Sequence, residues 1–144
     1  MKSRQKTHSK MNKKLFNKNW SAKIDKSLFS KKTKPLTETR LYEKGKKSGY
    51  RLTVRGTRPN GSNYEWGYEA KKDGKAFPIY GREDADAIIA YKVTEEITIG
   101  DFLKKGKIVA AYKRSISKDG KKLTVVFAGI DNKNKPYFNV IEYV

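Results

Sequence analysis

The sequence predicts an all-β protein: a single up-and-down antiparallel β-barrel or half-barrel of about eight or nine short strands, preceded by a basic, flexible N-terminal arm. Three observations predict this fold. Apolar and polar residues alternate with a period of two from about residue 36 onward. Turn-forming residues interrupt the alternation at short intervals, and positive charge is concentrated in the first quarter of the chain.

The period-two alternation is clearest in four stretches of the body. One member of each pair of neighbours is expected to face a shared core and the other to face water. The residues expected to face the core are Tyr50, Leu52 and Val54, then Tyr64, Trp66, Tyr68 and Ala70, then Leu123, Val125 and Phe127, and finally Phe138 and Val140.

Turn signals separate these stretches. Asn60-Gly61, Asp73-Gly74 and Asp119-Gly120 are pairs that adopt the positive φ of tight turns. Strands are expected near residues 37–43, 49–56, 63–71, 75–80, 87–93, 97–103, 107–117, 121–130 and 136–143. Tight hairpins pair each strand with its neighbour in sequence, and a long meander tends to curl, so a barrel or half-barrel is favoured over a flat sheet. Residues 82–87 are expected to form a loop, and residues 101–103 a bulge or a helical turn.

The composition fits one domain with an appended basic segment. The chain has 144 residues, of which 36% are hydrophobic and 12% aromatic. The hydrophobic share is below the usual value of about 45–50%, but the aromatic share argues against disorder throughout. There is no cysteine and only one histidine, His8, which excludes disulfides, thiolate zinc sites and multi-histidine metal sites. We expect a basic, disordered arm over residues 1–19 and a barrel domain over residues 20–144.

The charge excess is unevenly distributed. There are 34 basic and 15 acidic residues, a net charge of +19, and residues 1–34 contribute +11 of it because Asp25 is their only acid. Such a segment either solubilises the protein or lies on a polyanion and displaces its counterions. Leu15-Phe16 is the only strongly apolar pair near the start, so no secretory signal is expected. No apolar run approaches the roughly 18 residues of a membrane span, so none is expected, and a cytoplasmic location is predicted.

Several segments resemble one family in the same order along the chain. Residues 20–29 (WSAKIDKSLF), followed by Pro35, resemble the opening of small bacterial lipocalin-like proteins, a Trp followed by a Lys-Ser-x-Phe element and a Pro-containing loop. Residues 49–54 resemble their second strand, and residues 73–81 (DGKAFPIYG) resemble their D-G-K-x-[YF]-P-[VI]-x-G segment. Further similar pieces are residues 84–86, residues 117–125 and Asn139-Val140 with Tyr143, so that the similarity spans about residues 20–143.

This resemblance implies a calycin-type barrel but does not imply an activity, because the small group has no catalytic signature to carry over. Larger lipocalins commonly hold an apolar ligand in the barrel, which is an analogy at the level of fold. The chain departs from the small group in its basic arm, which stands where many members have a secretion signal, and in its high positive charge.

No enzymatic function is expected from the residues themselves. There is no G-x-G-x-x-G pattern and no P-loop, and His8 lies in the arm, where it is poorly placed to act as a triad base. The acidic groups at residues 83–86 and 95–96 fit solvated loops, because a metal site would need carboxylates converging from other strands. We therefore expect no catalytic residues, no metal and no cofactor.

The barrel interior supplies one candidate binding site. A barrel of about eight strands is either filled by its own side chains or just wide enough for one small ligand. Most inward residues are interpreted as core filler, with the polar tips of some tyrosine and tryptophan side chains at an open mouth. The candidate lining residues are Tyr50, Leu52, Tyr64, Trp66, Tyr68, Phe77, Phe127 and Phe138.

Basic residues supply the other candidate site. Arg51 and Arg55 fall on one face of a strand and, with Arg40 and Arg58, are expected to form a basic stripe. Neighbouring tyrosine and tryptophan rings would offer bases a stacking surface, and a generally cationic surface is the alternative. The polyanion-binding candidates are Lys2, Arg4, Lys6, Lys10, Lys13, Lys14 and Lys18 in the arm, and Arg40, Arg51, Arg55 and Arg58 in the body.

The sequence therefore favours a non-catalytic protein that attaches electrostatically to an anionic macromolecule, nucleic acid or ribonucleoprotein. The absence of a helix-turn-helix, zinc-finger or RNA-binding-sheet signature predicts contacts to phosphates and shape rather than to bases. Two alternatives stay open. One is a small apolar ligand inside the barrel, which would require an open cavity of at least about 300 Å³. The other is an inhibitor or adaptor that binds an acidic protein surface.

Overall fold

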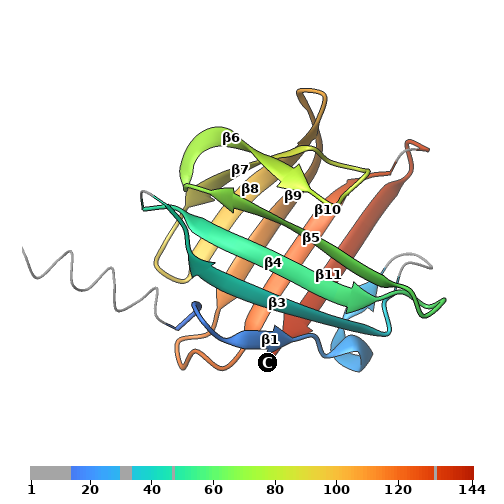
Figure 1. Ribbon diagram of the computed structural model, residues 1–144, viewed down its shortest axis with the longest axis horizontal. Coiled ribbons are helices and arrows are strands. Elements are labelled where there is room, and N and C mark those ends of the chain that lie inside the picture. Colours follow the sequence, from blue (N-terminus) through green and yellow to red (C-terminus); the bar gives the residue numbers. More distant parts are fainter. Residues whose placement is uncertain (1–13, 30–33, 47, 132) are drawn as a thin grey trace, which may run out of the picture.

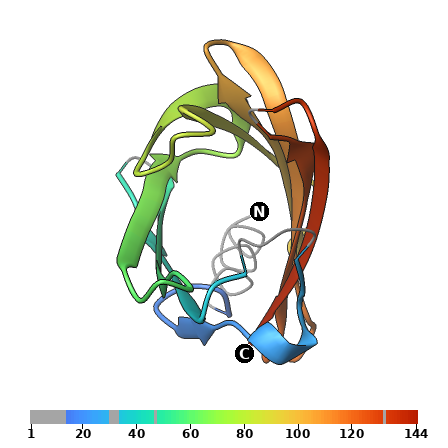
Figure 2. The same ribbon diagram turned by 90° about the vertical axis from the view of Figure 1, so that its right-hand side faces the viewer.

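The computed structural model describes residues 14–29, 34–46, 48–131 and 133–144. Within these ranges the protein is all-β, with eleven antiparallel strands in one sheet that curls into a half-barrel (Figures 1 and 2). A single 3-10 turn, η1 (Ile24–Lys26), lies between the first two strands. The strands are β1 (Asn19–Ser21), β2 (Leu28–Phe29), β3 (Thr37–Lys44), β4 (Tyr50–Thr57), β5 (Asn63–Ala70), β6 (Asp73–Tyr80), β7 (Ala87–Lys92), β8 (Ile97–Lys104), β9 (Lys107–Ile116), β10 (Leu123–Ile130) and β11 (Pro136–Tyr143).

The all-β class, the antiparallel meander and the curled half-barrel are confirmed, whereas the number of strands was underestimated. The nine expected stretches correspond to β3 through β11, each paired with its neighbour in sequence. The two additional strands, β1 and β2, have three and two residues. Strands this short show no period-two pattern, and they exist because β1 pairs with β3 and β2 pairs with β11.

The segment around β1 bridges the two sides of the curled sheet. Ala22 donates its backbone N–H to the carbonyl of Glu38 on β3 (2.9 Å). One residue earlier, Ser21 and Val144 exchange backbone hydrogen bonds of 2.8 and 2.9 Å at the end of β11. Figure 2 shows this segment and η1 at the bottom of the ring of strands, where the first and last parts of the chain meet.

The folded domain begins earlier than the sequence analysis placed it. Leu15 is 5% exposed and accepts a 3.0 Å hydrogen bond at its carbonyl from the indole N–H of Trp20, which is completely buried. Asn17 donates its backbone N–H to Tyr42 on β3 (2.8 Å). Residues 14–19, which were assigned to the arm, therefore pack on the half-barrel, and residues 1–13 of the expected arm lie outside the described residues.

The interior holds the apolar residues expected for the first three stretches, but the last strand has the opposite phase. Phe138, expected to line the barrel with Val140 beside it, is 46% exposed on the outside, while Ile141 is buried. The reason is the register with β10, which pairs inward-facing Phe127 with Asn139 and outward-facing Ala128 with Phe138. Hydrophobicity alone did not separate the two faces of β11, because apolar side chains occur on both.

The turns follow the residues that predicted them. Gly61, Gly74 and Gly120 all have positive φ, between 74° and 87°. Residues 81–86 form a loop, as expected, and the pairing of β8 with β9 shifts register between Phe102 and Leu103, which makes this position a bulge rather than a helical turn. Over the described ranges, no helix has the length and apolar character needed to cross a membrane.

Candidate functional site

Alternate hairpin loops of an antiparallel meander lie at opposite ends of the half-barrel, so the fold has two chemically distinct ends. The basic end carries loops 45–49, 71–72, 93–96 and 117–122, toward the left of Figure 1, together with the turn at residues 14–18. The cavity end carries loops 58–62, 81–86, 105–106 and 131–135 and the segment 34–36. Each end contains one candidate site.

A cavity of about 430 Å³ opens at the cavity end. Aromatic and aliphatic side chains make up part of its wall, and three guanidinium groups and two carboxylates make up much of the rest. The lining residues are Phe29, Pro35, Glu38, Arg40, Arg58, Pro59, Tyr64, Trp66, Gly81, Arg82, Asp84, Phe127, Tyr137, Asn139 and Ile141. The cavity therefore carries one more positive than negative group on an aromatic scaffold.

Arg40 and Glu38 lie next to each other on the inner face of β3 and are joined through tyrosines. Arg40 is 4% exposed and donates from Nε to the hydroxyl of Tyr143 (2.8 Å) and from Nη1 to the hydroxyl of Tyr42 (3.2 Å). Tyr143 in turn donates to the Glu38 carboxylate, which also accepts from Tyr64 (2.7 Å). Burial raises the pKa of both Tyr143 and Tyr64, which keeps these hydroxyls protonated as donors. Glu38 thus balances the buried charge of Arg40.

Two further arginines stand at the cavity rim. Arg82 forms a bidentate ion pair with Asp84, with both N–O distances 2.7 Å, and its guanidinium lies 4.5 Å from the centre of the Trp66 ring. Burial raises the pKa of Asp84, but the hydrogen bond and charge of Arg82 outweigh it and lower the value overall. Arg58 lies 5.4 Å from the Tyr64 ring. The rim arginines are therefore oriented by stacking on aromatic rings that also line the cavity.

The structure separates the expected lining residues into three groups. Tyr64, Trp66 and Phe127 line the cavity. Phe77 and the deeper residues Tyr50, Leu52 and Tyr68 pack in the core, and Phe138 lies outside, as described above. The sequence analysis missed Glu38, Arg40 and Arg82 as cavity residues. In the strand Thr37–Lys44, the residues Glu38, Arg40 and Tyr42 do fall on one face. Because two of the three are charged, the sequence suggested that this face is exposed to solvent.

The expected basic stripe does not form. Arg40 is paired in register with Val54 rather than with Arg55, so its side chain enters the barrel while Arg51 and Arg55 face outward. On the outer face, Arg55 is ion-paired with Glu65 at 2.7 Å and Arg51 with Glu69 at 3.5 Å. Arg58 is at the cavity end. The candidates from Lys2 to Lys13 lie outside the described residues.

Positive charge gathers instead at the basic end. Its described loops and the 14–18 turn hold eight lysines and three carboxylates, a net charge of +5, whereas the cavity end holds six basic and four acidic residues, a net charge of +2. The acids of the basic end are Glu95, Glu96 and Asp119, and the lysines are Lys14, Lys18, Lys46, Lys71, Lys72, Lys118, Lys121 and Lys122.

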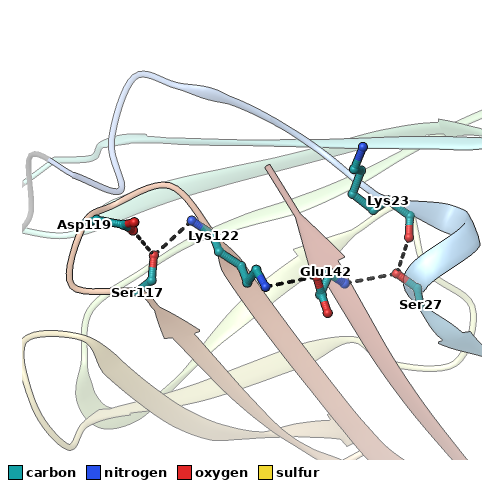
Figure 3. Close-up of polar contacts among 6 residues, drawn as sticks. All are labelled: Lys23, Ser27, Ser117, Asp119, Lys122 and Glu142. Carbon is teal, nitrogen blue, oxygen red and sulfur yellow. Dashed lines mark hydrogen bonds and ion pairs between the residues drawn. The ribbon is translucent and has the colours of Figure 1, made fainter.

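The 117–122 loop at the basic end is held in place by a polar network (Figure 3). Ser117 donates to Asp119 (2.6 Å) and accepts from the backbone N–H of Lys122 (3.0 Å), while the Lys122 ammonium is ion-paired with Glu142 at 3.5 Å. The hydrogen bond from Ser117 lowers the pKa of Asp119. Lys14 and Lys18 reach the same loop and donate to the backbone carbonyls of Lys118 and Gly120. The loop thus brings lysines from both ends of the sequence together.

Comparisons of the chain with protein-family models, with curated proteins and with solved structures give no match. Among the described residues, no group of three or more histidine and carboxylate side chains has the arrangement of a metal site. The similarity to lipocalin-like proteins stays a prediction from the sequence.

Proposed function

We propose that the protein is a non-catalytic binding protein whose basic end attaches to the phosphate backbone of a nucleic acid. The observation that carries the proposal is the charge of this end, +5 over its described loops against +2 at the other end. Residue 14 lies at the same end. The segment that precedes it contains five basic residues and is connected to the domain at this point. A cytoplasmic location stays a prediction.

Lysine ammonium groups suit this role because they are flexible point charges that accept any phosphate geometry. Each lysine that meets a phosphate releases condensed counterions, so the logarithm of the binding constant falls with the logarithm of the salt concentration by about 0.7–0.9 per contact. Six or more contacts would weaken binding about 10³-fold between 50 and 200 mM salt.

The two loops that flank β10 provide a matched test. Lys118→Glu/Lys121→Glu changes the basic end, and Lys133→Glu/Lys135→Glu makes the same change in charge at the cavity end. All four side chains are exposed in hairpin loops. Binding to a fluorescein-labelled 20-nucleotide RNA is measured by anisotropy over a series of KCl concentrations.

We expect the basic-end variant to bind at least tenfold more weakly than the cavity-end variant, with a salt slope smaller by about two contacts. Equal losses in the two variants would mean that the net charge alone attracts RNA, and the proposal would be wrong. Undiminished binding in the basic-end variant would also contradict it. Capture of an acidic protein but no RNA would favour the adaptor alternative.

The cavity supports a second candidate function, the binding of a small ligand. Its volume exceeds the threshold of about 300 Å³, but its wall is not purely apolar. Three guanidinium groups beside Trp66 and Phe127 suit an amphipathic ligand with an anionic group rather than a neutral apolar one.

The amphipathic anion 1-anilinonaphthalene-8-sulfonate is a suitable probe for this second candidate. We expect saturable fluorescence enhancement that weakens about tenfold in Arg82→Leu and is unchanged in Arg55→Leu, because Arg82 lines the cavity and Arg55 lies on the outer face. Equal weakening in both variants, or binding that never saturates, would contradict a defined site.

A further inference from the structure

Among the residues that the structure describes, two arginines are buried inside the half-barrel, and their surroundings differ sharply. Arg40 is 4% exposed and Arg114, on the inner face of β9, is 5% exposed. Arg40 is balanced by Glu38 through shared tyrosine hydroxyls. Arg114 makes no ion pair with any described carboxylate, and its one hydrogen bond to a described residue runs from Nη2 to Thr98 on β8 (2.8 Å).

An uncompensated buried guanidinium is expensive. It carries five N–H donors, and removing its charge from water costs several kcal/mol unless an opposite charge or several acceptors replace the water. The rings of Tyr42 and Tyr50 cover Arg114, with their centres 4.8 and 5.7 Å from its Cζ. Such stacking stabilises a cation only partly, by about 2 kcal/mol when desolvated. The remaining donors of Arg114 lack acceptors among the described residues.

A second group at the same place also lacks a partner. Tyr112 precedes Arg114 by two residues on the inner face of β9 and is 7% exposed. Its hydroxyl has no well-formed hydrogen bond with the described residues and interacts only weakly with the hydroxyl of Tyr50. The hydroxyl lies over Gly100 of β8, where an added Cβ would stand 2.8 Å from it, next to the Arg114–Thr98 contact. A buried hydroxyl without a partner costs about 1–3 kcal/mol.

Lys72, in the 71–72 loop, is a third hydrogen-bond donor near this place. The ammonium of Lys72 lies 5.6 Å from the centre of the Tyr50 ring, which Arg114 also contacts. Burial lowers the pKa of Lys72 to about 7, with the charges of Arg114 and Lys92 contributing. Glu95, a carboxylate whose charge acts on Lys72, is ion-paired with Lys92 at 2.5 Å. Lys72 and Arg114 thus both lie against the Tyr50 ring.

We propose that Arg114, the Tyr112 hydroxyl and Lys72 form an internal site for a small inorganic anion, chloride or phosphate, at the basic end of the half-barrel. One anion would supply the missing counter-charge of Arg114 and the missing acceptor of Tyr112 together, which a water molecule cannot do because it carries no charge. The site is separate from the cavity, whose lining includes none of these three residues. Of the eight lysines counted at the basic end, it includes only Lys72, and neither Lys118 nor Lys121, the residues that test nucleic-acid binding, belongs to it.

The test is thermal unfolding of the full chain, followed by circular dichroism at constant ionic strength while sodium gluconate is replaced by sodium chloride or sodium phosphate. Because an anion that binds only the folded state stabilises it by mass action, we expect the unfolding midpoint to rise by about 4 °C for each tenfold increase in anion above its dissociation constant. The salt that acts at the lower concentration identifies the preferred anion. Arg114→Met should abolish the rise, whereas Arg51→Met, at an outward-facing arginine, should keep it.

Tyr112→Phe keeps the test decisive if Arg114→Met does not fold. With an anion bound, losing the hydroxyl removes a donor, so the variant should require several-fold more anion for the same rise. Without an anion, the change removes an unsatisfied buried group, and the variant should be at least as stable as the wild type in every buffer. That result, or the same anion dependence in the wild type and Arg114→Met, would overturn the proposal.

Discussion

Replacing Glu38 by glutamine should strongly destabilise the half-barrel. The change leaves the shape of the side chain almost intact and removes only its charge. Two tyrosine hydroxyls donate to this carboxylate, and through Tyr143 it faces the guanidinium of Arg40, which is 4% exposed. After the substitution Arg40 remains in the interior without a counter-charge.

The magnitude follows from the burial of the arginine. Removing one partner of a buried ion pair typically costs about 3–5 kcal/mol, because the other charge stays desolvated. Glu38 itself is only partly buried and lines the cavity, where water reaches it, so the lower end of that range applies. At about 3 °C per kcal/mol for a domain of this size, the unfolding midpoint should fall by about 9 °C.

Urea denaturation measures this change against a control on the outer face of the same sheet. Glu65→Gln removes the carboxylate that pairs with Arg55 at 2.7 Å, where both side chains are largely exposed, so it should cost at most about 1 kcal/mol. The double variant Arg40→Met/Glu38→Gln removes both charges and should recover most of the loss.

Equal effects of Glu38→Gln and Glu65→Gln would refute the reasoning, because they would show that burial does not decide the cost. A double variant less stable than Glu38→Gln would refute it as well. That result would mean that Arg40 stabilises the fold even without its counter-charge.

Three further changes test other parts of the structure by thermal unfolding. Deleting residues 1–19 should destabilise the protein by about 2–5 kcal/mol more than deleting residues 1–13, because residues 14–19 contribute a buried leucine and backbone bonds to β3; equal midpoints of the two deletions would be inconsistent with the packing of residues 14–19. Gly100→Ala should destabilise by more than the roughly 1 kcal/mol expected for Gly61→Ala, because its Cβ would lie 2.0 Å from a carbonyl oxygen of β7, while Gly61 has open space and a positive φ. Lys72→Met should raise the midpoint at pH 6 and progressively less toward pH 10 in gluconate buffer. The pKa of this lysine is about 7 in the folded protein and 10.5 for an ordinary lysine in water, so wild-type stability rises with pH between these two values; a pH-independent difference would contradict the assigned burial.

Local sequence signals were sufficient for the fold class and for most strands. Alternation at Tyr50, Leu52 and Val54 identified a strand and its buried face, and Asn60-Gly61 and Asp119-Gly120 identified turns, because both signals depend on a few consecutive residues. β1 could not be found in this way. Its three residues become a strand only through hydrogen bonds with β3, a segment about twenty positions away.

The candidate sites were harder to predict than the fold. Arg40 has the same sequence character as Arg55, yet one is buried beside Glu38 and the other is exposed beside Glu65. The difference is one of register, since shifting a strand by one residue exchanges its two faces. The charge of the basic end was equally hidden, because its lysines come from four segments that only the meander brings to one end.

The sequence by itself determined an antiparallel all-β domain with a large positive charge, because alternation, turn residues and composition are local or additive properties. Only the tertiary structure decided where that charge lies. Strand register carries Arg40 and Arg114 into the interior, and the alternation of hairpin loops gathers lysines at one end and opens a cavity at the other. Both depend on pairing between distant strands, and the free energy of that pairing is not encoded in any single stretch of the chain.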